Sequence, residues 1–337
     1  MSYAPRTHLA MGEDTFRLLF DEARRDRIAA IADAGDPLFL GSLEDPAHAD
    51  ALAETEVLIT SWGAPRLDAE ALSRMPRLQA VFHAAGTVRE VATDALWERG
   101  IVVTTAADAN AIPVAEFTHA AIVLATKRTF FHVRTAHEHQ RGWFGHEPRL
   151  GYGNLGRAIG VVGFSRTGRR VVEKLRALEG ARVLVSDPFA DADRVAAAGA
   201  ELVSLEEMIP AVDVLSLHAP SLPSTRHMIG RAELAALRDG AVLINTARGS
   251  ILDHDALLAE CRTGRIDAIL DVTEPEPLPA ASPLLALPNV AITPHIAGSL
   301  GGETRRLADA AIDELEAFVA GRPAMHRIHA QDMGMTA

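Results

Sequence analysis

The stretch from residue 158 to 175, AIGVVGFSRTGRRVVEKL, constrains the fold more than any other part of the chain. Its apolar start is typical of a buried strand, and Val172 and Leu175 follow at helical spacing. Between them lies a short turn with Gly163 and Gly168. A strand, a tight turn and a helix in this order place helix N-terminal amides against a bound phosphate. The stretch therefore predicts half of a nucleotide-binding α/β domain.

This turn departs from the dinucleotide fingerprint G-x-G-x-x-G at its central position, where Ser165 stands in place of glycine. The central glycine normally lets the backbone approach the pyrophosphate, so a hydroxymethyl group there either adds a hydrogen bond or displaces the cofactor. Because the serine side chain is small and the flanking residues fit, we expect binding to be retained. The expected contacts are Gly163, Ser165, Arg166, Thr167 and Gly168.

A second apolar run, ARVLVSD, ends at Asp187, which lies 187 − 168 = 19 residues after Gly168. An acidic side chain at about this spacing accepts hydrogen bonds from the adenosine ribose hydroxyls. No Arg or Lys occurs among the six residues after Asp187, so the pattern favours NAD over NADP. The alternative is that Asp187 simply ends a strand before the turn at Pro188.

Composition limits the class of protein. A chain of 337 residues with 48% hydrophobic content can bury a large core, and its length favours two domains. A formal net charge of −12 without Lys/Arg clusters argues against nucleic-acid and membrane partners. The single cysteine, Cys261, lies in a helical pattern, where we expect a buried thiol. No metal site is indicated. The N-terminus has no signal pattern and no apolar run approaches membrane-spanning length, so we expect a cytoplasmic protein.

Apolar runs alternate with helical patterns from residue 15 to 106, beginning with TFRLLF, which is typical of a parallel sheet covered by helices. The pattern becomes a long helix from Asn110, with Pro113 near its expected start. The amphipathic pattern at 301–322 plausibly returns to the first domain. We therefore expect a discontinuous substrate-binding domain, 1–109 plus 298–337, and a nucleotide-binding domain, 110–297. The loops at 60–65 and 83–88 lie where open α/β sheets bind ligands, although the glycines alone, Gly63 and Gly86, favour ordinary strand-end turns.

Three polar residues at strand ends stand out, namely Arg248 in NTARGS, Glu276 in DVTEPEPL and His295 in TPHIAG. Each alone has a structural explanation: Arg248 pairing with Asp253, Glu276 as a turn acid, His295 as a satisfied loop histidine. Their joint occurrence is hard to explain in that way. With PVAEF, the glycine turn, Asp187 and LHAP, these motifs make residues 57–320 resemble the D-isomer-specific 2-hydroxyacid dehydrogenase family.

The resemblance implies two Rossmann-like or flavodoxin-like parallel-sheet domains, with the active site in the cleft between them. It also implies NAD-dependent interconversion of a 2-keto acid and a D-2-hydroxy acid. Reduction needs a cation for the carboxylate, a proton donor for the developing alkoxide and a positioned hydride donor. Arg248 suits bidentate carboxylate binding, and His295 suits proton transfer near neutral pH. A Glu276 carboxylate beside the imidazole stabilises its protonated form and fixes its tautomer.

Further roles follow only from the resemblance. Asp271 and the backbone near Thr246 and Ala247 are expected at the nicotinamide, and His218, Pro220 and Thr225 at the adenine. His295 and Gly298 complete the expected cofactor contacts, and the amides of Ala85, Gly86 and Thr87 are expected at the substrate carboxylate, with Arg248 and His295. Formate-specific relatives usually carry glutamine in place of Glu276, which argues against formate. We also expect no regulatory domain of the kind found on many phosphoglycerate dehydrogenases.

Two questions stay open from the sequence. One is whether the chain is a cofactor-sensing binding protein similar to the family's corepressors, an alternative with which the unusual Ser165 is consistent.

The other open question is the oligomeric state. Residues 130–153 hold Phe130, Phe131, Trp143, Phe144 and Tyr152, although only 5% of the chain is aromatic. Large aromatic side chains commonly anchor interfaces, and the resemblance implies pairing through an arm at about 128–153, so we expect a homodimer. The alternative is that these rings pack within their own subunit.

Overall fold

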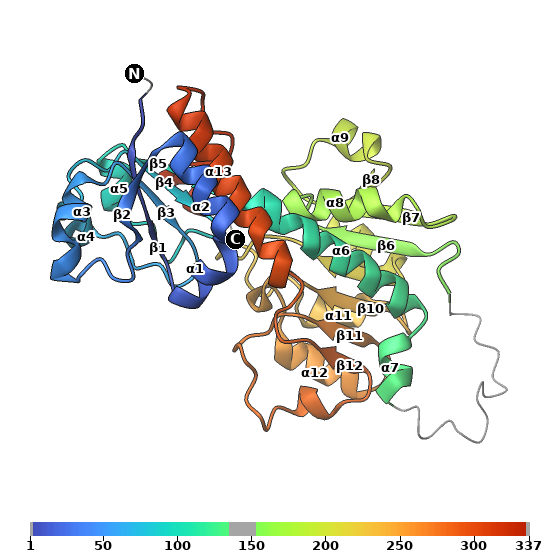
Figure 1. The fold of residues 1–337 in the computed structure, drawn as a ribbon. Coiled ribbons are helices and arrows are strands. Elements are labelled where there is room, and N and C mark those ends of the chain that lie inside the picture. The colour runs from blue at the N-terminus through green and yellow to red at the C-terminus, as the bar shows by residue number, and fades with distance from the viewer. Residues whose placement is uncertain (1–2, 135–152, 335–337) are drawn as a thin grey trace. The chain divides into compact units, whose positions relative to one another are not determined.

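The computed structural model describes residues 3–134 and 153–334. The chain forms two compact units, one made of Met1–Ala111 and Ser299–Ala337 and the other of Ile112–Gly298. The first is called unit 1 below and the second unit 2. The division near residue 111 falls inside helix α6, which spans Ala107–Thr126. Each unit contains a sheet covered by helices (Figure 1).

Unit 1 is built on a six-stranded sheet of order β13-β5-β4-β3-β1-β2, parallel except for β13. Its strands are β1 (Arg6–Ala10), β2 (Asp33–Phe39), β3 (Val57–Thr60), β4 (Ala80–His83), β5 (Val102–Thr105) and β13 (Arg327–Ile328). Its helices are α1 (Glu13–Leu19), α2 (Glu22–Ile31), α3 (Ala49–Glu54), α4 (Ala69–Ser73), α5 (Asp94–Glu98) and α13 (Arg305–Val319). One apolar core lies under α1, α2 and α13, and a second lies on the other side of the strands.

Unit 2 has a seven-stranded parallel sheet of order β12-β11-β10-β9-β6-β7-β8. Its strands are β6 (Ala158–Val162), β7 (Arg182–Ser186), β8 (Glu201–Leu202), β9 (Val214–Leu217), β10 (Val242–Asn245), β11 (Asp267–Leu270) and β12 (Val290–Ile292). After α6 its helices are α7 (Thr129–Arg134), α8 (Arg166–Leu175), α9 (Ala192–Ala197), α10 (Leu205–Met208), α11 (Arg231–Ala236) and α12 (His254–Arg262). The expectation of two parallel-sheet α/β domains is confirmed.

The prediction was wrong at the start of unit 1. TFRLLF belongs to α1 rather than to a strand, because Phe16, Leu19 and Phe20 contact one core at the i, i+3, i+4 spacing of a helix. The first strand is instead β1, which the sequence reading missed. Its centre holds two buried polar residues, Thr7 and His8, which interrupt the apolar pattern of a parallel strand.

Pro113 is also placed differently from the expectation. Because α6 begins at Ala107, Pro113 lies inside the helix and removes an amide that would otherwise bond within it. By length and composition α6 is long and apolar enough to cross a membrane. Ala115, Ala121 and Ile122 nevertheless pack into the core of unit 2, as expected for the core helix of a globular unit.

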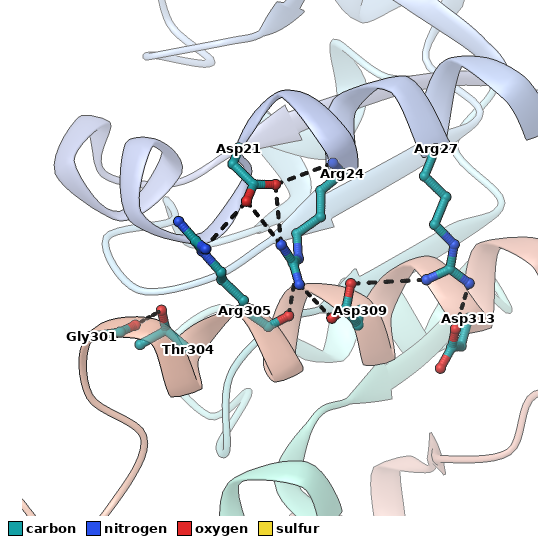
Figure 2. A network of polar contacts seen from close by, with 8 residues as sticks. All are labelled: Asp21, Arg24, Arg27, Gly301, Thr304, Arg305, Asp309 and Asp313. Atoms are coloured by element: carbon teal, nitrogen blue, oxygen red, sulfur yellow. Dashed lines mark hydrogen bonds and ion pairs between the residues drawn. The ribbon is translucent and has the colours of Figure 1, made fainter.

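Helix α13 packs beside α2 in unit 1 (Figure 1). Leu307, Ala311 and Leu315 enter the core on one side of α13. On another side Arg24 donates to Asp309 at 2.6 Å and Arg27 donates to Asp313 at 2.6 Å, as Figure 2 shows. A polar network therefore joins the last long helix of the chain to an early one.

Part of the expected dimerisation arm packs within its own unit. Phe131 is buried in the core of unit 2, and Phe130 packs against the same core. The alternative of intramolecular packing is therefore correct for this pair. Trp143, Phe144 and Tyr152 lie outside the described residues. Cys261 is buried in α12, as expected, and burial raises the pKa of its thiol to about 12.

Candidate active site

Arg248, Glu276 and His295 follow three neighbouring strands of unit 2, namely β10, β11 and β12. These strands are parallel, so their carboxyl ends lie at the same edge of the sheet. The segments of Glu276 and His295 are joined by a side-chain bond, and the loop of Arg248 lies against the backbone of Thr273 at Gly249. The strand order therefore brings to one sheet edge residues that are separated by 28 and 19 positions (276 − 248 and 295 − 276).

His295 and Glu276 form a direct pair. The imidazole Nδ1 lies 2.5 Å from Glu276 Oε1, and the side chains are 50% and 40% exposed. Within the described residues, Nε2 of His295 has no hydrogen-bond partner. A carboxylate in this position favours a proton on Nδ1, which leaves Nε2 available to a ligand.

The segment that carries His295 is held by a buried carboxylate. Asp271 is 2% exposed, and it accepts hydrogen bonds from Thr293 Oγ1 at 2.6 Å, Ile296 N at 2.8 Å and Ala297 N at 2.9 Å. Its own carbonyl accepts from the amide of His295 at 3.0 Å. These bonds support the backbone of His295, whose φ of 55° lies in the left-handed region that residues other than glycine seldom adopt. Sequence reasoning placed Asp271 at the cofactor and missed this supporting role.

A similar arrangement holds the loop that carries Arg248. The buried Asn245 side chain donates to the carbonyl of Arg248 at 2.9 Å and accepts from Ala247 N at 3.0 Å. A Cβ atom at Gly249 would lie 2.1 Å from the carbonyl oxygen of Thr273, so only glycine lets this loop lie against the segment that leads to Glu276. Asn245 and Gly249 flank Arg248 within NTARG, yet the motif gave no indication of what either residue does.

The glycines of the β6–α8 turn are required by close contacts. Gly163 has a φ of 95°, and a Cβ atom there would lie 2.7 Å from the amide nitrogen of Ala219. At Gly168 a Cβ atom would lie 2.0 Å from the Gly163 carbonyl oxygen. Ser165 is the N-cap of α8, and its hydroxyl accepts from Gly168 N at 3.2 Å. The serine side chain is therefore turned onto its own helix.

This turn fits a dinucleotide. Among residues 3–134 and 153–334, no hydrogen bond has the amide of Arg166 or Thr167 as its donor, so the first turn of α8 presents two amides suited to a pyrophosphate. Asp187 lies beside them, because its carboxylate accepts from Phe164 N at 2.8 Å and Phe189 N at 2.9 Å. The carboxylate expected at the ribose and the turn expected at the phosphates are thus joined directly.

Other expected cofactor residues have protein partners. His218 bonds through Nε2 to Ser216 Oγ at 2.8 Å, and burial lowers its pKa to about 3, so the ring is neutral. Thr225 Oγ1 donates to the carbonyl of Pro220 at 2.5 Å. The hydroxyl of Thr246 bonds to Thr118 Oγ1 at 2.8 Å. Thr225 and Thr246 therefore shape their loops with their side chains.

Ala85, Gly86 and Thr87 follow β4 in unit 1. The carbonyl of Ala84 accepts from Ser61 Oγ at 2.8 Å, and the carbonyl of Ala85 accepts from Ala106 N at 3.0 Å. Within the described residues, the amides of Ala85, Gly86 and Thr87 donate no hydrogen bond. A run of unpaired amides of this kind suits an anion such as a carboxylate. No group of three or more side chains suited to a metal ion occurs in the described part of the chain.

Comparisons with known proteins agree with this geometry. Residues 120–297 match the model for the D-isomer specific 2-hydroxyacid dehydrogenase NAD binding domain. The chain is 36% identical over 265 residues to glyoxylate reductase from Aeropyrum pernix, which covers 76% of this chain and 78% of that protein. It is 31% identical over 280 residues to D-3-phosphoglycerate dehydrogenase from Methanocaldococcus jannaschii, which covers 82% of this chain.

The chain spans only 52% of the length of that phosphoglycerate dehydrogenase. Among solved structures, a phosphoglycerate oxidoreductase from Rhizobium etli superposes with a TM-score of 0.77 at 26% identity, over 97% of this chain and 98% of that one. The chain therefore belongs to the D-isomer-specific 2-hydroxyacid dehydrogenase family, and its cofactor is NAD.

Proposed function

We propose that this protein is an NAD-dependent dehydrogenase that interconverts a small 2-keto acid and the corresponding D-2-hydroxy acid. The observation that carries the proposal is the His295–Glu276 pair, in which Nδ1 lies 2.5 Å from the carboxylate while Nε2 has no partner in the described part of the chain. An imidazole held in this way is suited to protonate a carbonyl oxygen as it becomes an alkoxide.

The other residues have complementary roles. In reduction, His295 donates its Nε2 proton to the substrate oxygen, and Glu276 stabilises the positive charge of the ring before this transfer. Arg248 binds the carboxylate and carbonyl oxygens of the substrate, since its planar guanidinium presents several fixed donors. Bound NADH supplies the hydride that this proton transfer accompanies.

The cofactor contacts are part of the proposal. The amides of Arg166 and Thr167 bind the pyrophosphate, and Asp187 accepts from the adenosine ribose and repels a 2′-phosphate. Ser165 is compatible with this arrangement because its hydroxyl is bonded to the Gly168 amide rather than held free in the turn. The serine therefore gives no support to the alternative of a binding protein with little activity.

We also place the substrate carboxylate at the amides of Ala85, Gly86 and Thr87 in unit 1. Unpaired amides and a guanidinium are both complementary to a carboxylate, so a 2-keto acid with a small substituent satisfies them together. The relatives named above suggest glyoxylate, hydroxypyruvate or a phosphorylated C3 acid as candidates.

The direct test is NADH oxidation followed at 340 nm with a panel of 2-keto acids. The panel contains glyoxylate, hydroxypyruvate, 3-phosphohydroxypyruvate, pyruvate and a 2-keto acid with a bulky side chain. We expect at least one acid to be reduced, with NADH preferred over NADPH. NADH binding without reduction of any acid would instead favour the cofactor-sensing alternative.

A homodimer remains part of the proposal. Its support is the family to which the chain belongs and the concentration of Trp143, Phe144 and Tyr152 in one segment of the sequence. Sedimentation equilibrium at micromolar concentration gives twice the 36.0 kDa chain mass if the proposal is correct. A single-chain mass would rule the dimer out.

A further inference from the structure

A basic hollow lies on unit 2 between α8 and α9 (Figure 1). Its volume is about 600 Å³, and four arginines and one glutamate line it, in a chain whose formal net charge is −12. A concave surface with such an excess of guanidinium groups is complementary to an anion. The charged and aromatic residues of its lining are Phe164, Arg169, Arg170, Glu173, Arg176 and Arg194.

Two of these arginines have no partner in the described part of the chain. Among residues 3–134 and 153–334, the guanidinium groups of Arg176 and Arg194 form no hydrogen bond or ion pair. The stem of Arg176 packs on Gly199, where a Cβ atom would lie 3.3 Å from its Cγ. In unit 1, by contrast, Arg24 and Arg27 are held by carboxylates (Figure 2). The hollow therefore presents positive charge that no structural ion pair in this part of the chain uses.

The hollow adjoins the carboxylate expected at the ribose. Phe164 lines the hollow and donates its amide to Asp187 Oδ2 at 2.8 Å. The Asp187 carbonyl accepts from Ala190 N at 3.2 Å, and the Asp191 side chain caps α9 by accepting from Arg194 N at 2.9 Å. One tight turn thus connects Asp187 to the first turn of the helix that carries Arg194.

A phosphate on the adenosine 2′-oxygen is the anion that this place favours. An acidic residue at the position of Asp187 binds the ribose 2′-hydroxyl of NAD, and NADP carries its additional phosphate on that oxygen. A phosphate monoester has a charge of about −1.5 to −2 near pH 7, and the arginine fork suits its oxygens. Asp187 repels such a group, whereas the neighbouring hollow attracts it. The six residues after Asp187 contain no cation, and Arg194 is the first beyond them.

We propose that this basic hollow is a preformed site for the 2′-phosphate of NADP, with Arg194 as its main ligand, and that Asp187 keeps the site unused. The inference rests on the proposed function, in which Asp187 lies at the adenosine ribose. The choice between NAD and NADP is then decided by one carboxylate, because the cations that a 2′-phosphate needs are already in place.

The test measures the dissociation constants of NADH and NADPH by fluorescence titration of the full chain, without a 2-keto acid. We expect Asp187→Ser to bind NADPH about 30-fold more tightly than the wild type, and NADH about tenfold more weakly, since the change removes both a repulsion and a hydrogen-bond acceptor. Asp187→Asn keeps an acceptor for the amide of Phe164 or Phe189, and it should shift both constants in the same directions if the serine variant does not fold.

Arg182 supplies a matched control for Arg194. It begins β7, whose other end leads to Asp187, and its exposed guanidinium donates to Glu201 Oε2 at 2.7 Å. Adding Arg194→Ala to Asp187→Ser should weaken NADPH binding about tenfold and change NADH binding less than about twofold, because NADH has no 2′-phosphate. Adding Arg182→Ala removes the same charge from the same unit and should change neither constant.

The outcomes separate this inference from the proposed function, because the titrations need no turnover. If NADH binding weakens but NADPH binding does not improve, Asp187 keeps its role at the ribose and the inference is overturned. Equal losses of NADPH affinity with Arg194→Ala and Arg182→Ala would overturn it as well, since the gain would then come from removing the repulsion alone. Unchanged NADH binding in both Asp187 variants would contradict the ribose contact of the proposed function, and the inference with it.

Discussion

His83 ends one parallel strand and His295 follows another, each at the carboxyl edge of its sheet, yet their surroundings give them opposite chemistry. His83 is 3% exposed, bonded to a neutral hydroxyl, and its pKa is lowered by burial to about 4. The His295 side chain is 50% exposed and bonded to a carboxylate. A buried imidazole without a charged partner stays neutral and serves as a fixed hydrogen-bonding group, whereas an accessible imidazole beside a carboxylate is suited to exchange protons. The hydrogen-bond partner of each histidine and its exposure to solvent, rather than the residue type, therefore decide its role.

Removing His295 should produce the largest effect. We expect His295→Ala to lower kcat by about 100-fold or more, the usual contribution of a positioned general acid, with little change in NADH affinity. His227→Ala is the matched control, since His227 also has a positive φ, of 51°, and lies 3.6 Å from the Glu274 carboxylate in the same unit. Steady-state kinetics and NADH fluorescence titration make the comparison. Equal losses in the two variants would remove the special role of His295.

Weakening the hydrogen bonds that hold the His295 segment should have the next largest effect. In Asp271→Asn, the new amide group faces one of the donors Thr293, Ile296 or Ala297, so the His295 segment loses at least one bond. We expect kcat to fall by about tenfold or more. Asp253→Asn removes the charge of an N-cap that accepts from Ala256 N in the same unit, and it should leave kcat near the wild-type value. A normal kcat in Asp271→Asn would limit Asp271 to a structural or cofactor role.

The carboxylate beside His295 should affect how activity depends on pH. Glu276→Gln replaces the carboxylate that contacts His295 Nδ1 with a neutral amide. Because the proposed proton transfer depends on this pair, the pH profile of the reduction rate should differ from that of the wild type. Glu274→Gln, which alters the neighbouring carboxylate bonded to Arg226, should leave the profile in place. Coincident profiles for Glu276→Gln and the wild type would contradict the pairing in catalysis.

The buried histidine should affect stability rather than turnover. The folded-state pKa of His83 is about 4, below the ordinary histidine value of about 6.5, so the stabilisation from its neutral state is complete above pH 6.5 and is lost as the pH falls toward 4. The full loss is about 3 kcal/mol by linkage. Urea unfolding midpoints at pH 8, 6 and 5 should fall more steeply for the wild type than for His83→Gln. Parallel curves would show that His83 is not neutral in the folded protein.

Sequence patterns predicted much of unit 2. Its strands are apolar runs that end at turns, and Gly163, Gly168 and Asp187 keep a spacing that the β6–α8 geometry requires. The same patterns were less informative in unit 1, because β1 carries buried polar side chains at Thr7 and His8 and α1 follows after a short connection.

Supporting residues were harder to predict than the reactive ones. The Asp271 carboxylate accepts from amides that are 25 and 26 positions away, and only the folded chain shows which amides it meets. Asn245 bonds within its own loop, but the motif does not show which carbonyl and amide its side chain meets. Arg248, Glu276 and His295 were easier to single out because charged or titratable groups at strand ends suggest chemistry on their own.

The measurement that tests the account most directly is the chirality of the product. A 2-keto acid that the panel shows to be reduced, with a substituent that makes its carbonyl carbon prochiral, is converted with NADH, and the 2-hydroxy acid is resolved by chiral chromatography. We predict the D enantiomer, formed by the wild type and by His227→Ala and at least about 100-fold more slowly by His295→Ala. An L or racemic product, or D product formed at the wild-type rate by His295→Ala, would contradict the account.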